Sequence, residues 1–457
     1  MKSINYIKPI FFHVLLGIGV YGLRFLSKLY LIAVIVYFTN QIVRAKPSQK
    51  ALKILVACGY VVGAEVFLRM TGGSLLYETS KYVVIFYMLI GIFTIRTNKE
   101  SMPFIIYVFL LIPGVLVAGL NATEETNIRT AIAFNLSGPV CLGIVSIFCY
   151  KLKFSLQAVQ KVLFYMLLPI ISITSYLFIY TPNIGETLTG TGSNFVASGG
   201  FGPNQVSTIL GLGMFVLTVR FFMLSPTLFL KVINGFLLAA VSFRGIVTFS
   251  RGGVLTGLFM IMAFVFIYFN KVNKKAKFRI SRLLVIFASL GVLIWLFSSI
   301  QTSGLIENRY TNRDALGREK ADVSTGRSDL ISFELEEFFK NPILGVGVGK
   351  IKELREIETG LRVATHNEMS RILSEHGLFG VIAFSILLLT PLFFRLKNRS
   401  NIFFYSCFLF WFLTINHSSM RIAAPAFIYG LCLLDIQYKT NRVKSNKLKE
   451  KKQLTSI

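Results

Sequence analysis

Acidic side chains, cysteines and histidines are all scarce in this chain of 457 residues. It contains 21 Asp and Glu against 48 Lys and Arg, with five cysteines and four histidines. No two cysteines form a CxxC pair, and no two histidines stand at metal-ligand spacing with a carboxylate. The sequence therefore predicts no disulfide framework, no metal site and no cofactor. We expect the five thiols, all in apolar runs, to behave as small buried hydrophobic groups.

Charge is missing altogether from long stretches of the chain. The windows 254–269 and 381–394 contain no Asp, Glu, Lys or Arg, and 54% of all residues are hydrophobic. Helical runs near 20 residues can cross a hydrocarbon layer of about 30 Å, since each residue adds about 1.5 Å. A soluble chain would instead alternate polar and apolar positions. We expect an all-α polytopic membrane protein with about 14 transmembrane helices (12–14), the segment 9–43 forming one span or two. The expected spans are approximately 9–23, 26–43, 51–68, 82–95, 103–120, 129–150, 162–181, 205–222, 228–243, 252–270, 283–300, 377–394, 402–416 and 421–437.

The formal net charge of +27 follows the expected membrane topology. Basic residues gather in short connections that alternate with nearly uncharged ones, as the positive-inside rule describes. On this basis every basic connection and both termini lie on the cytoplasmic side, and binding to nucleic acid is not expected. The basic connections are 44–53, 151–161, 271–282, 395–399 and 439–452.

The few acidic residues gather in one segment. Thirteen of the 21 lie between Gln301 and Glu375, together with 11 Lys and Arg. This composition predicts a large extracytoplasmic loop at 301–376. The loop would follow N-terminal transmembrane helices at 1–300, and C-terminal helices at 377–437 and a basic cytoplasmic tail at 438–457 would follow it.

Local patterns predict two helices inside this loop. The segment 329–340 places apolar residues among acids at near-helical spacing and is ended by Asn341-Pro342. Thr365 and Glu368 have the spacing of a capping box, so a second helix should begin just after Thr365. The glycines of 345–349 predict a flexible turn between the two. Another outer segment, 181–204, is rich in Gly, Thr and Ser and predicts a flexible loop that could cover a site.

His366 is the first candidate for a general base. An imidazole can take a proton from a hydroxyl group near neutral pH, and the positive end of a helix dipole would keep it neutral. The competing interpretation is a surface histidine that only hydrogen-bonds within the loop. His376 fits an interfacial residue better than a catalyst, His417 is a weaker functional candidate, and His13 lies in the first expected span.

Four arginines are candidate anion ligands on the outer face. Arg251 lies in FSRGGVLTG at a span end, where a guanidinium is costly unless it has a partner or lines a wet cavity. Its planar donor fork suits phosphate oxygens. Arg244, Arg327 and Arg421 are expected on the same face. Each also has a structural interpretation, such as snorkelling for Arg244 and pairing with Asp329 for Arg327.

Four short motifs, taken in order, resemble the O-antigen ligase and polymerase superfamily of bacterial membrane glycosyltransferases. They are SRGG at Ser250–Gly253, TGRSD at Thr325–Asp329, NPILGVGVG at Asn341–Gly349 and HNEMSRILSEHGLFG at His366–Gly380. The resemblance covers about the C-terminal half, from Pro203 to Phe394. Each motif is weak alone, and their order together with the single large outer loop makes the set fairly specific.

The resemblance implies a GT-C-like fold and a metal-independent, inverting glycosyl transfer at the periplasmic face of the bacterial inner membrane. The donor would be a glycan linked to undecaprenyl diphosphate, and the acceptor would be lipid A–core or a growing glycan. Carried over by motif, Arg251 and Arg327 would bind the donor diphosphate. His366 would activate the acceptor hydroxyl, and Asn367 would orient it.

Three functions stay open at this point. We prefer the ligase, because SEHG after the histidine resembles ligase-type relatives, and a repeat-unit polymerase with the same chemistry is the alternative. A polysaccharide transporter or lipid flippase is the second alternative. Such transporters usually have paired repeats and interrupted helices, whereas this chain concentrates its polar residues in one loop.

Overall fold

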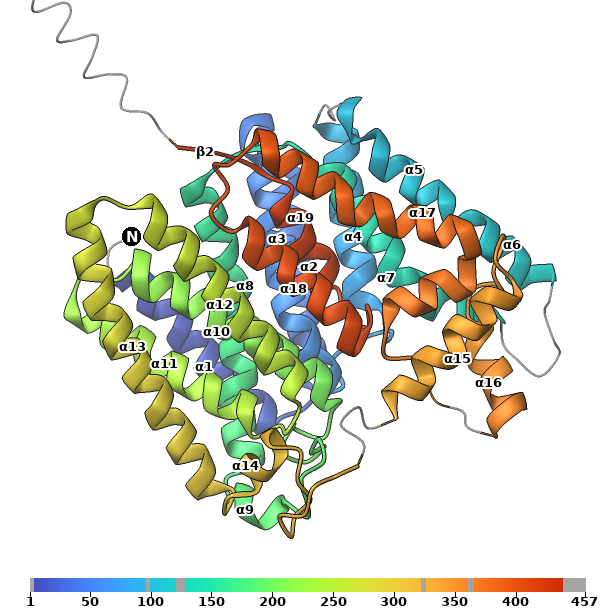
Figure 1. Cartoon of the computed structure of the whole chain (residues 1–457). Coiled ribbons are helices and arrows are strands. Elements are labelled where there is room, and N and C mark those ends of the chain that lie inside the picture. The colour runs from blue at the N-terminus through green and yellow to red at the C-terminus, as the bar shows by residue number, and fades with distance from the viewer. Residues whose placement is uncertain are drawn as a thin grey trace, which may run out of the picture.

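The computed structural model describes residues 4–95, 99–120, 128–321, 326–360, 363 and 365–438. The expected tail at 439–457 and Thr325 of the second motif lie outside the described residues. Helices make up most of the described part, with one short pair of strands (Figure 1). The elements are α1 (Ile4–Gly22), α2 (Leu26–Val43), α3 (Pro47–Met70), α4 (Thr79–Thr94), the 3₁₀ turn η1 (Lys99–Ser101), α5 (Met102–Leu110), α6 (Ile112–Leu120), α7 (Ile128–Cys149), β1 (Lys153–Ser155), α8 (Leu156–Tyr180), α9 (Ile184–Thr187), α10 (Pro203–Met223), α11 (Leu228–Ile246), α12 (Arg251–Lys271), α13 (Lys274–Gln301), α14 (Leu305–Tyr310), α15 (Arg327–Lys340), α16 (Ile351–Thr359), α17 (Glu368–Lys397), α18 (Phe404–Ser418), α19 (Ala424–Cys432) and β2 (Asp435–Gln437).

Every expected span overlaps a helix, although α19 fills only Ala424–Cys432 of the span expected at 421–437, which ends in β2. Ten helical segments of the described chain are long and apolar enough to cross a membrane, and two shorter apolar helices, Tyr6–Gly22 and Thr79–Thr94, accompany them. The helices α5 and α6 together fill the span expected at 103–120. The all-α polytopic membrane fold is thus confirmed. The number of spans stays a prediction, since α18 and α19 have only 15 and 9 residues.

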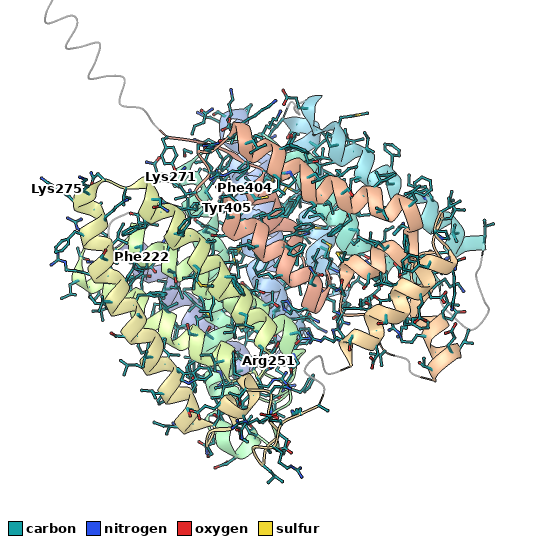
Figure 2. The ribbon with its side chains drawn as sticks, viewed as in Figure 1. Phe222, Arg251, Lys271, Lys275, Phe404 and Tyr405 are labelled. Atoms are coloured by element: carbon teal, nitrogen blue, oxygen red, sulfur yellow. The ribbon has the colours of Figure 1, made fainter. Side chains whose placement is uncertain are left out.

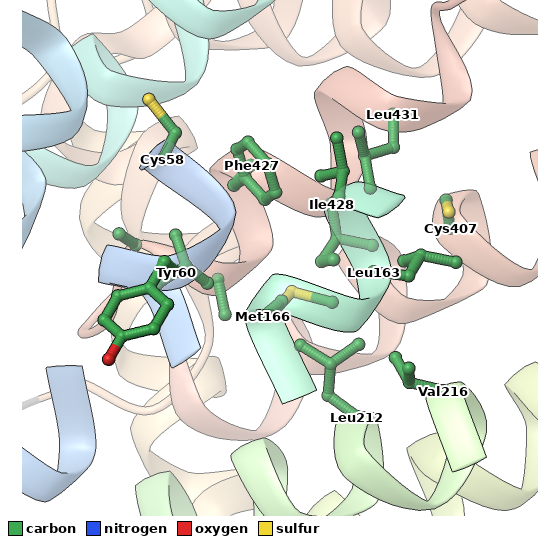
Figure 3. Packing of buried hydrophobic residues seen from close by; sticks show 14 of the residues in the cluster. Cys58, Tyr60, Leu163, Met166, Leu212, Val216, Cys407, Phe427, Ile428 and Leu431 are labelled. Atoms are coloured by element: carbon green, nitrogen blue, oxygen red, sulfur yellow. The ribbon is translucent and has the colours of Figure 1, made fainter. Parts of the chain in front are cut away.

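Helices α3, α8 and α10 form the middle of the bundle. Their most apolar windows are 83%, 78% and 94% buried, whereas that of α13, at the edge of the bundle in Figure 1, is only 11% buried. Figure 3 shows part of this packing, where Met166 of α8 lies among buried side chains that include Leu212 and Phe427. The five cysteines are free and buried, as expected.

Glycines let α12 approach α10 closely. A Cβ atom on Gly253 would lie 2.3 Å from the backbone of Ser207, and one on Gly257 would lie 2.7 Å from the carbonyl oxygen of Gly211. Because glycine has no Cβ, the two backbones can touch at these points. The contact fixes the position of the first turn of α12, which begins with Arg251.

Three basic connections share one end of the bundle, as the charge pattern predicts. There β1 pairs in parallel with β2. The side chain of Asn398 donates to the carboxylate of Asp435 at 2.6 Å, and Lys271 donates to the carbonyl of Arg399. The compartment that this end faces stays a prediction.

Fixed contacts hold the outer segment 181–204 at the opposite end. The amide of Asn194 donates to the carbonyl of Thr248 at 2.9 Å. The hydroxyl of Thr191 donates to the carbonyl of Arg313, also at 2.9 Å. The segment is thus tied to the α11–α12 turn and to the chain after α14, so the expectation of a free loop is wrong. Glycine and threonine serve here to make tight turns and hydrogen bonds.

Candidate functional site

Asn367, and not Thr365, caps the helix that follows His366. Its side-chain oxygen accepts hydrogen bonds from the amides of Met369 and Ser370 at 2.9 and 3.2 Å. The hydroxyl of Thr365 donates to the carbonyl of Asn367 instead. The expected capping box is therefore wrong by two positions, because an Asn side chain reaches the free amides of a first turn as well as a Thr does. His366 precedes the helix and does not lie in its first turn.

The chain around His366 is pinned to the connection between α18 and α19. The amide of Ser419 donates to the carbonyl of His366 at 3.1 Å. The guanidinium of Arg421 donates to the carbonyl of Thr365 at 2.9 Å. The imidazole itself is half-buried, and its Nδ1 is enclosed without a hydrogen-bond partner among the described residues. The backbone around His366 is thus fixed, and Nδ1 is closed off from solvent.

Arg251, Arg309 and Arg327 gather on the same side of the molecule. Arg251, which Figure 2 shows at the opposite end of α12 from Lys271, donates to the carbonyl of Arg309 at 3.3 Å. Arg309 in turn donates to the carbonyl of Phe249 at 2.9 Å. Burial lowers the pKa of Arg309, and the charges of Arg251 and Arg327 lower it further. The pKa of Arg327 is likewise lowered by burial and then by Arg251. The charges of these three arginines therefore act on one another.

The same charges act on His366. Burial lowers the pKa of His366 to about 4, and the charges of Arg421 and Arg327 are the next causes. His417 and Arg355 lower it further. The helix dipole was the expected cause of a neutral imidazole, but burial and arginines have this effect instead. The structure therefore brings His366 into electrostatic contact with two of the predicted arginines.

Arg244 is not available to a substrate. Its side chain is fully buried, and its Nη2 donates to the hydroxyl of Thr181 at 2.7 Å and to the carbonyl of Ala197 at 3.0 Å. Snorkelling does not describe it either, since the guanidinium turns inward to the backbone of the 181–204 segment. A guanidinium with no exposed surface cannot meet a phosphate, so we leave Arg244 out of the site.

The other histidines have different surroundings. His417 lies beneath the SRGG motif, where a Cβ on Gly252 would come within 2.4 Å of its ring. Its Nε2 is 3.3 Å from the hydroxyl of Thr208, and its Nδ1 is 2.8 Å from the carbonyl of Leu413. His376 was expected at the membrane interface. It is instead buried against α6. In the part of the chain that the structure describes, no three His, Cys, Asp or Glu side chains gather as metal ligands would.

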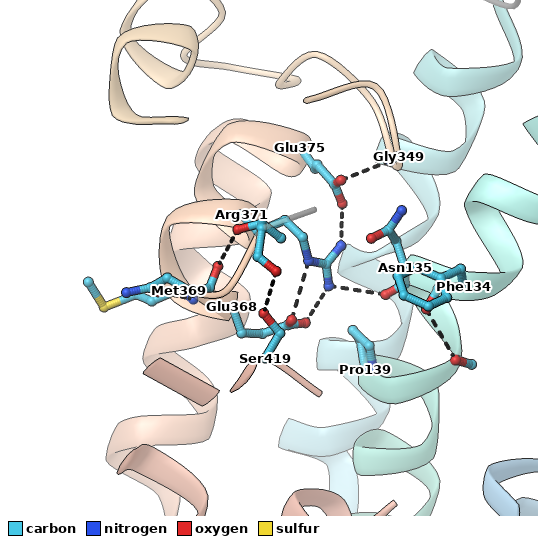
Figure 4. Close-up of polar contacts among 12 residues, drawn as sticks. Phe134, Asn135, Pro139, Gly349, Glu368, Met369, Arg371, Glu375 and Ser419 are labelled. Carbon is cyan, nitrogen blue, oxygen red and sulfur yellow. Dashed lines mark hydrogen bonds and ion pairs between the residues drawn. The ribbon is translucent and has the colours of Figure 1, made fainter. Parts of the chain in front are cut away.

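A buried ion network that the sequence analysis missed supports the start of α17. The guanidinium of Arg371 lies between the carboxylates of Glu368 and Glu375 and donates to the carbonyl of Asn135 at 3.0 Å (Figure 4). All three charged side chains are buried. Their spacing of three and four residues is an ordinary helical charge pattern, so nothing in the sequence distinguishes it from a solvated surface.

The segment 345–349 is fixed in the structure, and the expectation of a flexible turn is wrong. The amide of Gly349 donates to the carboxylate of Glu375 at 2.9 Å, and the amide of Val346 donates to the carbonyl of Ser374. Gly347 has a φ of 94°, and a Cβ there would lie 2.7 Å from the backbone of Ala118. The glycines therefore serve close packing against α6 and α17.

A further buried ion pair joins α15, the helix that begins at Arg327, to α16. The guanidinium of Arg355 on α16 donates to Glu334 of α15 at 2.8 Å, and both side chains are buried. The hydroxyl of Ser370 on α17 donates to the same carboxylate at 2.5 Å. These contacts tie α15, α16 and the start of α17 together, so the helix that begins at Arg327 is connected to the helix that follows His366.

A cavity of about 380 Å³ lies beside this unit. Thr365, Arg371 and Arg421 line it together with residues of α7 and α16. Its wall carries charged groups of both signs, including Glu353 and Lys352. Apolar side chains, including Phe134, Ile351 and Met420, line it as well, so the charged groups are set into a largely apolar wall.

Comparison with protein-family models gives a match in the C-terminal half of the chain. Residues 235–385 match the family model described as O-antigen ligase. The matched stretch includes Arg251, Arg327 and His366, which the structure brings together, and ends before Arg421. It confirms the resemblance to the O-antigen ligase and polymerase superfamily. No curated protein sequence matches the chain.

Proposed function

We propose, from the O-antigen ligase domain at residues 235–385, that this chain is a membrane glycosyltransferase. Its donor is an oligo- or polysaccharide linked to undecaprenyl diphosphate, and its acceptor is a hydroxyl group at the periplasmic face of the bacterial inner membrane. The observation that carries the proposal is the half-buried imidazole of His366, on which the charges of Arg421 and Arg327 act. A base and an anion clamp on one face are what this transfer requires.

The donor diphosphate binds to the arginine cluster. Arg251 and Arg327, with Arg309 behind them, offer guanidinium donors to its oxygens. These donors are fixed before the reaction, so they stabilise the charge that grows on the leaving diphosphate without reorganisation. Four arginines near the site supply the positive charge, so we propose a metal-independent reaction.

His366 is the proposed base. The acceptor oxygen attacks the anomeric carbon from the face opposite the diphosphate, and its proton passes to the imidazole of His366. The bond from the anomeric carbon to the diphosphate oxygen breaks, and the leaving undecaprenyl diphosphate keeps the electron pair. The configuration at the anomeric carbon is inverted.

Donor binding also prepares the base. Arg421 and Arg327 hold the pKa of His366 down in the empty site. The negative diphosphate offsets these charges and moves the pKa upward, toward the range in which an imidazole accepts protons well near neutrality. Proton transfer is thereby favoured only when the donor is in place.

The cavity beside Thr365 and Arg421 is the proposed acceptor site. Its charged wall can hydrogen-bond the hydroxyl groups of a sugar. We propose lipid A–core as the acceptor, which makes the protein a ligase. A growing glycan in the same cavity would make it a polymerase with the same chemistry.

Replacement of His366 by Ala tests the proposal in a host deleted for the gene. A general base contributes about 10²- to 10⁴-fold, so glycan transfer should nearly stop. Undecaprenyl-linked polymer that accumulates without reaching lipid A–core supports the ligase. Single repeat units on the core, without a ladder, support the polymerase.

A matched control is Arg318→Gln, which removes an exposed arginine of the same loop. It should leave the surface glycan unchanged. Normal glycan with His366→Ala would remove the proposed base. Purified protein that consumes no undecaprenyl-linked donor, while glycan export in cells depends on it, would favour the transporter.

A further inference from the structure

A large cavity lies at the end of the bundle opposite to the candidate site. It has a volume of about 1330 Å³ and lies among α1, α2, α8 and α10. The helix α10 begins beside the SRGG motif, where Asn204 accepts a hydrogen bond from Ser250, and ends at the cavity with Met223. Its 21 residues separate the two places by about 30 Å. The cavity is therefore distinct from the proposed transfer site.

A buried arginine in its wall has no anion beside it. Arg220 is only 7% exposed, and its Nε has no hydrogen-bond partner among the described residues. Its guanidinium lies over the rings of Tyr6 and Phe164, with centroid distances of 4.1 and 4.7 Å. In the part of the chain that the structure describes, it forms no ion pair. Inside a membrane protein, such a cation needs a negative partner or a wet cavity.

The wall of this cavity carries positive charges at its solvent-exposed mouth and is mostly aromatic or aliphatic further in. Lys8 and Lys161 line the cavity and are exposed, and no acidic residue contributes to the wall. The polar hydroxyl chain from Tyr30 through Tyr60 to His13 lies on its inner wall, with hydrogen bonds of 2.9 and 2.8 Å. A ligand that fits this wall has a negative head, a long apolar body and some polar atoms between them.

We propose that this cavity binds an anionic phospholipid, with the phosphate on Arg220, Lys8 and Lys161 and the acyl chains along the aromatic wall. Basic pockets between membrane helices on the side of the basic connections are suited to anionic head groups. The volume exceeds the range of about 300–1,000 Å³ that is usual for small-molecule sites, as two acyl chains require. The lipid would join α1 and α2 to the central helices α8 and α10 and would leave the transfer site free.

The test measures which lipid remains on the purified full-length protein. The protein is exchanged into detergent with equal amounts of phosphatidylglycerol and phosphatidylcholine, and the bound lipid is counted by native mass spectrometry. Phosphatidylglycerol should be retained in preference. The double variant Lys8→Gln/Lys161→Gln should weaken this retention by about fivefold for each lysine removed. Both lysines are exposed, so the variant should fold normally.

The matched control is Lys46→Gln/Lys153→Gln, which removes the same charge from exposed positions of the same end, outside the cavity. It should keep the preference for phosphatidylglycerol. Arg220→Gln should abolish the preference, with folding checked by normal detergent-solubilised yield.

Equal retention of both lipids would mean that bulk lipid fills the cavity. Equal loss in both double variants would mean general surface attraction, and displacement by millimolar inorganic phosphate would mean a small-anion site. Each of these results would overturn the proposal.

Discussion

Replacing Arg421 with Gln should raise the pKa of His366 in the protein without substrate. Burial lowers that pKa to about 4, and Arg421 is the largest of the neighbouring charges that lower it. Removal of one like charge near an ionisable group relieves on the order of one pKa unit. Added undecaprenyl diphosphate should act in the same direction, because its negative charge offsets those of the arginines.

The contrast is largest near pH 5.5. With a pKa of about 4, roughly 3% of the imidazole is protonated at that pH. At the ordinary pKa of about 6.5, roughly 90% would be protonated. A rise of one unit increases the protonated share at pH 5.5 about eightfold, to roughly 24%. Because the neutral imidazole is the proposed base, kcat/KM, which reports the free enzyme, should fall only as the pH drops toward 4.

Histidine-selective isotope labelling makes this measurable by NMR, since the chain has four histidines. The variant His366→Gln identifies the signal of that residue by its loss. Arg318→Gln serves as the control, because this exposed arginine of the same loop pairs with Asp314. A pKa near 6.5 for His366 in the unmodified protein would refute the reasoning. A pKa that does not respond to Arg421→Gln or to undecaprenyl diphosphate would also do so.

Three further substitutions test how the site is supported. Arg371→Met leaves two buried carboxylates without their partner and should lower the stability by about 3–5 kcal/mol, which is measured as faster thermal inactivation in detergent. An unchanged rate of inactivation would contradict the buried network. Gly252→Ala forces a methyl group against the ring of His417 and should lower the stability by about 1–3 kcal/mol. Gly291→Ala, whose methyl group meets nothing within 4 Å, should be neutral or slightly stabilising. Similar rates of thermal inactivation for the two variants would show that the contact with His417 is absent. Asn367→Ala removes the helix cap and should lower the stability by about 1 kcal/mol, whereas Asn367→Asp should keep both stability and glycan transfer. If Asn367→Asp keeps the stability but loses transfer, the amide of Asn367 contacts the substrate.

The membrane helices could be predicted closely from the sequence. Each expected span overlaps a helix, because the apolar length that crosses a bilayer is a local property of the chain. The helix at 329–340 and its end at Asn341 were also predicted, since Asn-Pro acts within its own neighbourhood. The exact cap of α17 was not, because Thr365 and Asn367 are both good caps and only the path of the preceding chain decides between them.

The prediction for the glycine-rich segments was wrong because their conformation also depends on distant parts of the chain. The glycines of 345–349 were expected to give flexibility, yet they allow close contact with backbone atoms of α6 and α17. Composition reports the conformations that a segment can adopt. Which of them it adopts depends on a partner surface that is far away in the sequence.

The sequence by itself determined the membrane class, and it predicted the large loop and the residue types of the candidate site. Hydrophobic length, charge distribution and short motifs are local properties, so they can be recognised in the sequence without a structure. Only the tertiary structure decided which charges meet. It joined Arg251 with Arg309 and Arg327, turned Arg244 into the protein, and placed Arg421 beside the chain of His366. Burial and long-range contact set these electrostatic effects, and neither is a property of a single segment.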